Sequence, residues 1–144
     1  MIAACVLRFY DFFGIPYTHD EFSALFRTRF DTFTELINNG VKVDTLPAGI
    51  QVFLFFWIKL FGDTEWVVKL PFLLFGVGSV YLIYVVARKW YNETVALVVA
   101  AFLASLQYTV FYSQVARPYI SGLFFSLLMV NALTNLIKTP EKRF

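Results

Sequence analysis

Apolar residues form three long runs in the second half of the chain, over residues 66–87, 94–112 and 118–137. Each run is close to the roughly 20 residues that an α-helix needs to cross a hydrocarbon core about 30 Å thick. Charged residues are rare inside them. The pattern predicts three membrane-spanning helices, and with them an all-α, polytopic membrane protein.

Two shorter apolar stretches precede these runs. The stretch over residues 47–61 contains Lys59 and is too short to cross, so it predicts a juxtamembrane helix that does not span. Residues 1–8 are interpreted as the last turns of a span that begins earlier, and the chain is accordingly interpreted as a fragment. Residues 9–65 then form its first outer loop.

The outer loop contains a second helical pattern, over about residues 18–39. Thr18 and Glu21 have the spacing of a capping box, and Asn38-Asn39-Gly40 is typical of a helix end. The apolar residues between them recur at helical spacing, so we expect one amphipathic helix lying flat on the membrane. Its apolar stripe consists of Phe22, Leu25, Phe26, Phe30, Phe33, Leu36 and Ile37.

Basic residues follow the first and the third long runs. Arg88 and Lys89 follow the first, and Lys138, Lys142 and Arg143 follow the third. Cytoplasmic loops carry an excess of lysine and arginine, so both clusters are assigned to the cytoplasmic side. The outer loop and residues 112–119 are then expected to share the opposite side.

Composition agrees with a membrane protein and excludes other classes. The chain has 144 residues, of which 59% are hydrophobic and 15% charged, with a mean hydropathy of +0.67 and a net charge of +2. Membrane lipids are therefore expected partners, whereas the small, dispersed positive charge does not predict nucleic-acid binding. The single cysteine, Cys5, excludes an internal disulfide.

Asp20 and Glu21 are candidate catalytic acids in the outer loop. Acidic residues are favoured in the first turn of a helix, and this role together with capping explains Glu21. Asp20 lies almost opposite the apolar stripe, so its carboxylate is free to accept a proton from an acceptor hydroxyl. His19 beside it is interpreted as a local hydrogen-bonding residue, since further metal ligands are not evident.

Arg117 is the candidate anion-binding residue. A guanidinium at the end of a span either reaches for lipid headgroups or pairs with an anion, and its planar fork suits a phosphate. Gln114 and Tyr112 are expected to assist it, and Pro118 begins the next helix beside it. Asp44 is a further candidate in the outer loop. No cofactor or metal site is predicted, although a divalent cation at Asp44 is left open.

Three smaller features concern packing and capping. Asn92 begins a glycosylation sequon, but a helix cap is the simpler interpretation. Gly76 and Gly78 are expected to let neighbouring helices approach closely.

Four short motifs occur in order along the chain: His19-Asp20-Glu21, residues 46–51 (LPAGIQ), residues 59–62 (KLFG) with 68–71 (VKLP), and residues 112–119 (YSQVARPY). Their order resembles the membrane glycosyltransferases of the GT-C class, in the branch of the protein O-mannosyltransferases and the lipid A aminoarabinose transferase. The resemblance implies transfer of a sugar from a polyprenyl-phosphate donor with inversion, Asp20 acting as base and Arg117 binding the lipid phosphate. It also implies an active site on the periplasmic or lumenal face, and we expect a multi-pass protein of the bacterial inner membrane with the site on the periplasmic face.

Two other functions remain open at this point. A transporter or lipid-binding subunit could use Arg117 as its anion site. A structural membrane protein could use the outer polar residues only to anchor its helices. The sugar and the acceptor are not predicted.

Overall fold

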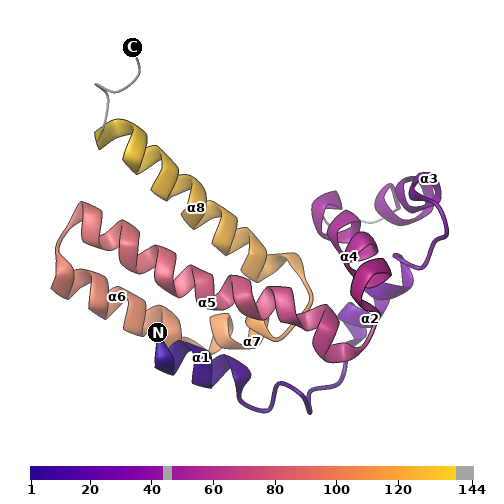
Figure 1. The fold of residues 1–144 in the computed structure, drawn as a ribbon, viewed down its shortest axis with the longest axis horizontal. Coiled ribbons are helices and arrows are strands. Elements are labelled where there is room, and N and C mark those ends of the chain that lie inside the picture. The colour runs from indigo at the N-terminus through magenta and orange to yellow at the C-terminus, as the bar shows by residue number, and fades with distance from the viewer. Residues whose placement is uncertain (44–46, 139–144) are drawn as a thin grey trace.

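The structure, a computed structural model, describes residues 1–43 and 47–138, and this part of the chain is helical with no strand (Figure 1). The predicted all-α fold is confirmed. The elements are α1 (Ile2–Phe9), α2 (His19–Phe26), α3 (Phe33–Glu35), a π-helical turn η1 (Leu36–Val41), α4 (Ala48–Phe61), α5 (Glu65–Trp90), α6 (Glu93–Ser105), α7 (Gln107–Ser113) and α8 (Pro118–Lys138).

The central helix is α5, which packs against α1, α6, α7 and α8. Both α5 and α8 are long and apolar enough to cross a membrane, and α6 with α7 forms a third candidate span. Figure 1 shows α2, α3 and α4 gathered at one end of α5, whereas the α5–α6 turn lies at the other end. The chain is therefore built as an integral membrane protein with α2, α3 and α4 at one end of its long helices.

Small residues let the long helices approach, as predicted. A Cβ atom on Gly78 would lie 2.7 Å from the ring of Phe124 in α8. A Cβ atom on Gly76 would clash with Ser113 of α7. At the far end of α5, the side chain of Asn92 accepts a hydrogen bond from the backbone N–H of Val95 at 3.0 Å, so the helix cap at the start of α6 is confirmed.

The expected single helix over residues 18–39 is wrong, because the chain breaks after α2. The Thr28 hydroxyl donates to the Leu25 carbonyl at 2.8 Å at the end of α2. Thr32 then starts α3 with a second capping box, in which its side chain accepts from the Glu35 N–H at 3.3 Å. A capping box fixes the start of a helix, so two of them within one stretch produce two helices.

The third span is also not continuous. A bend of 60° separates α6 from α7 at Leu106, whose backbone is extended with ψ at 116°. The guanidinium of Arg8 donates to the carbonyls of Leu103 and Ala104 beside the bend, at 3.4 and 3.2 Å. The prediction of one straight span over residues 94–112 missed this break, because its partner lies about a hundred residues earlier.

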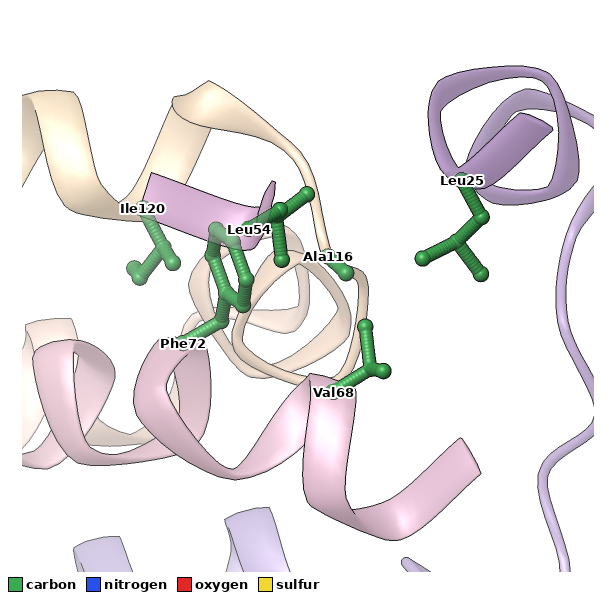
Figure 2. Packing of buried hydrophobic residues seen from close by; sticks show 6 residues of the cluster. All are labelled: Leu25, Leu54, Val68, Phe72, Ala116 and Ile120. Carbon is green, nitrogen blue, oxygen red and sulfur yellow. The ribbon is translucent and has the colours of Figure 1, made fainter. Parts of the chain in front are cut away.

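A buried apolar cluster joins the short helices to the spans. It contains Leu25 of α2, Leu54 of α4, Val68 and Phe72 of α5, Ala116, and Ile120 of α8. Figure 2 shows Leu25 pointing from α2 toward Val68 and Ala116. The cluster holds α2 against the turn that precedes α8, and this contact positions the candidate site.

Candidate active site

The capping box at the start of α2 places the two candidate acids. Thr18 accepts a hydrogen bond from the Glu21 N–H at 3.3 Å, and its own N–H donates to Glu21 Oε2 at 2.9 Å. The predicted capping role of Glu21 is confirmed. Asp20 precedes it in the first turn, and 70% of its side chain is exposed.

Glu21 faces the interior and connects three parts of the fold. Its side chain is fully buried, and Oε1 accepts the backbone N–H of Ala116 at 2.6 Å. Its other oxygen lies 3.6 Å from the ammonium of Lys69. Of the two acids expected to be catalytic, only Asp20 is therefore accessible, whereas Glu21 ties α2 to α5 and to the turn before α8.

Lys69 supports the site from behind, and the sequence analysis included it in the motif over residues 68–71 without giving it a role. It is fully buried in α5, and its ammonium donates to the carbonyls of Ile15 and Pro16 at 3.0 and 2.9 Å. A buried charge requires a partner and further hydrogen bonds, and Lys69 has both. The signal in the sequence was a lysine within the first predicted span, where charges are costly and usually paired.

Arg117 and Asp20 come together although they are far apart in the sequence. Arg117 Nη2 lies 3.8 Å from Asp20 Oδ1, so the two side chains form a long ion pair. Arg117 is only 8% exposed, and its Nε has no hydrogen-bond partner among the described residues. A buried guanidinium with an unmet donor is incompletely satisfied by the protein.

A cleft of about 240 Å³ is lined by both side chains. The ring of Tyr112 packs against the rings of Tyr108 and Tyr119, with centroids 4.5 and 4.6 Å apart. One wall of the cleft is therefore aromatic. An acid, a guanidinium and aromatic faces suit a polar ligand with a phosphate and a sugar ring. The cleft is lined by Thr18, His19, Asp20, Phe111, Tyr112, Val115, Arg117 and Tyr119.

The chain matches the family described as dolichyl-phosphate-mannose-protein mannosyltransferase over residues 47–143. It belongs to this mannosyltransferase family. The match covers the helices from α4 onward and includes Arg117, whereas Asp20 and Glu21 lie before it. No curated protein matches the chain, and no solved structure matches it.

Membership of the mannosyltransferase family confirms the resemblance to GT-C enzymes and identifies a membrane glycosyltransferase. Family membership also implies, in general terms, a sugar donor carried on a polyprenyl phosphate. Family membership therefore favours a glycosyltransferase over the transporter and the structural protein that the sequence left open.

The remaining predicted site residues, Tyr112, Gln114 and Asp44, differ in where the structure places them. Tyr112 lines the cleft. The Gln114 amide donates to the carbonyls of Arg8 and Tyr10 at 3.0 and 2.9 Å, so both of its N–H donors are used within the chain. Gln114 thus joins α1 to the turn and offers the cleft no donor. Asp44 lies outside the described residues, and no three metal-ligating side chains gather in the ranges 1–43 and 47–138.

Tyr17, directly before the capping residue of α2, has a perturbed acidity. Burial raises the pKa of the Tyr17 hydroxyl above its usual value of 10.0, and the negative charges of Glu65 and Asp63 raise it further. The hydroxyl donates to the Asp63 carbonyl at 2.9 Å, which joins the start of α2 to the loop between α4 and α5. Tyr17 is consequently a neutral structural contact that helps to place Asp20.

Proposed function

We propose that this membrane glycosyltransferase transfers a sugar from a polyprenyl-phosphate donor to an acceptor hydroxyl in the cleft lined by Asp20 and Arg117. The family description favours mannose as the sugar. The observation that carries the proposal is the juxtaposition of an exposed carboxylate and a buried, incompletely bonded guanidinium in the lining of one cleft.

Arg117 binds the lipid phosphate in this proposal. Its 3.8 Å separation from Asp20 is longer than the roughly 2.7–2.9 Å of a strong charge-assisted hydrogen bond, so the carboxylate satisfies it poorly. A phosphate can accept two parallel bonds from the guanidinium fork. The 21-residue helix α8 begins at Pro118, directly after Arg117, and its N-terminal dipole favours the same anion.

Asp20 acts as the general base. A phosphate bound to Arg117 competes for the guanidinium and releases the carboxylate toward the acceptor. The acceptor oxygen attacks the anomeric carbon as the bond from that carbon to the phosphate oxygen breaks, and the electron pair of this bond leaves with the phosphate. The hydroxyl proton passes to Asp20. A single displacement of this kind inverts the anomeric configuration, and Arg117 stabilises the charge that develops on the phosphate.

Activity of cleft variants tests these roles. We expect membranes containing the intact Asp20→Asn protein to consume radiolabelled polyprenyl-phosphate mannose about 10²–10⁴-fold more slowly than wild type, because the base is absent. Arg117→Gln should weaken use of the donor more than Arg117→Lys, which keeps the charge. Asp31→Asn is the matched control, since Asp31 is exposed and outside the cleft. Wild-type consumption by a folded Asp20→Asn protein would exclude Asp20 as the base.

The cleft faces the periplasm of a bacterial inner membrane in this proposal. Arg88 and Lys89 lie at the end of α5 opposite α2, which puts the cleft on the outer side by the positive-inside rule. In a background with Cys5 replaced by serine, an impermeant maleimide should label His19→Cys in intact cells and leave Tyr91→Cys unlabelled. Both positions are exposed in the structure. The reverse pattern would place the cleft in the cytoplasm.

A further inference from the structure

Arg8 is a buried cation at the end of α1 that the proposed reaction does not use. Its side chain is fully buried, although it carries one of the largest polar groups in the chain. A guanidinium has five N–H donors and stays charged inside a protein. Each of its three nitrogens donates, and the acceptors are all uncharged oxygens: Ala4 O, Leu103 O, Ala104 O, Thr109 Oγ1 and Ser113 Oγ.

Two of these acceptors, the carbonyls of Leu103 and Ala104, are free to accept because the third span is bent. In a continuous helix the carbonyls of Leu103 and Ala104 would accept from the amides four residues later. The extended backbone at Leu106 breaks this ladder. Within a bilayer each unmet backbone group costs several kcal/mol, so a side chain must replace the missing amides. Arg8 does so for both carbonyls, and the Thr109 hydroxyl adds a bond to Leu103 at 2.7 Å.

Arg8 also reaches the end of α7, from which the chain turns toward Arg117. Its Nε donates to Ser113 Oγ at 3.1 Å. Its backbone carbonyl accepts from the Gln114 amide at 3.0 Å. Gly76 of α5 leaves the room for this contact, because a Cβ atom there would lie 2.9 Å from Arg8 Nε. The residue is thus bonded on both sides of the bend and at the start of the turn.

We infer that Arg8 is a positioning residue, which holds the bent span and thereby fixes where Arg117 lies relative to Asp20. The part of this inference that concerns donor binding rests on the proposed phosphate-binding role of Arg117. Without the guanidinium, the carbonyls of α6 and the hydroxyl of Ser113 lose their common partner. The bend and the turn after it then no longer have one fixed geometry, whereas α5 and α8 keep their own packing.

The test compares Arg8→Gln and Arg8→Lys with the exposed control Arg88→Gln in the intact, detergent-purified protein. Arg88 pairs with Glu93 on the surface at 2.8 Å, at the other end of α5. One readout is the amide hydrogen-exchange rate of residues 107–117, compared with the rate of residues 66–87. The other is binding of farnesyl phosphate, a short prenyl monophosphate that carries no sugar.

We expect Arg8→Gln to speed exchange over residues 107–117 about tenfold and to weaken farnesyl phosphate binding by a similar factor, as the loss of buried hydrogen bonds predicts. Exchange over residues 66–87 should stay at the wild-type rate. Arg8→Lys should lie between Arg8→Gln and wild type, and Arg88→Gln should match wild type. A folded Arg8→Gln protein with wild-type exchange over residues 107–117 would overturn the inference, as would uniform acceleration along the whole chain.

A second variant keeps the test decisive if Arg8→Gln does not accumulate. Thr109→Val removes the hydroxyl that bonds both Arg8 and Leu103 while the charge stays in place. It should speed exchange over the same residues to a smaller extent, and unchanged exchange would contradict the inference. If farnesyl phosphate fails to bind even the wild-type protein, the proposed phosphate site is wrong, and the exchange measurement still decides the role of Arg8.

Discussion

Trp57 of α4 donates its indole N–H to the carbonyl of Val67 in α5, at 2.9 Å. Pro71 lies four residues after Val67 in the same helix and has no backbone N–H, so this carbonyl lacks its usual helical donor. The tryptophan replaces that donor from another helix. A proline in α5 thus creates the acceptor by which α4 is attached to it.

Replacing Trp57 with phenylalanine should weaken this attachment. The ring packing stays largely in place, but the Val67 carbonyl loses its donor, so we expect a loss of about 1–3 kcal/mol in the free energy of unfolding. Unfolding in mixed detergent micelles measures it. Trp66→Phe is the control, because Trp66 is about half exposed. Equal stability of the two variants would show that the indole hydrogen bond contributes nothing.

Glu21→Gln should destabilise the protein strongly. The substitution leaves the ammonium of Lys69 buried without its counter-charge, for which a loss of about 3–5 kcal/mol is typical. The double variant Glu21→Gln with Lys69→Met removes both charges and should recover part of this loss. The same unfolding experiment provides the double-mutant cycle. Additive losses from the two single variants would contradict a direct coupling between the side chains.

Gly76→Ala should cost about 1–3 kcal/mol of stability, because its methyl group would overlap Ser113 and press on Arg8. Gly122→Ala in α8 is the matched substitution, since a Cβ atom there meets nothing within 4 Å. Alanine is favoured over glycine inside a helix by up to about 1 kcal/mol, so Gly122→Ala should be neutral or stabilising. Thermal unfolding of both variants compares them. A tolerated Gly76→Ala would mean that α7 can move away from α5.

Stability should fall above about pH 10 through Tyr17. Its pKa is raised in the folded protein, so above the pKa of the unfolded chain the folded state holds more protons than the unfolded state. The contribution of Tyr17 to the free energy of unfolding is therefore fully present below about pH 10 and decreases as the pH rises further. Unfolding between pH 8 and 11 should show a shallower decline for Tyr17→Phe than for wild type. Identical profiles would assign the decline to other groups.

Some elements followed directly from the sequence because their cause is local. The starts of α2 and α6 depend on Thr18 and Asn92, each within three residues of its partner. The start of α8 at Pro118 was predicted, since proline is favoured in the first turn of a helix, whereas α5 has 26 residues and is longer than a bilayer requires. The second capping box, Thr32 to Glu35, was equally local and was overlooked because the apolar stripe continues through it.

Other features depend on partners that no local pattern indicates. The bend at Leu106 needs Arg8, and the burial of Glu21 needs Lys69 together with the N–H of Ala116. The pairing of Asp20 with Arg117 could be expected only as a shared side of the membrane, from the distribution of basic residues. Distances between segments that are far apart in the chain come from packing, which a single sequence does not display.

The bend in the third span also affects the surrounding lipid. With 13 residues, α6 is about 20 Å long, roughly 10 Å less than the thickness of a hydrocarbon core. Because α7 is inclined by 60° to α6, it adds only about half of its own length to the depth that the span covers. The outer leaflet is expected to thin around α7 in order to match it, and lipid headgroups beside the cleft would then sit deeper than elsewhere in the membrane.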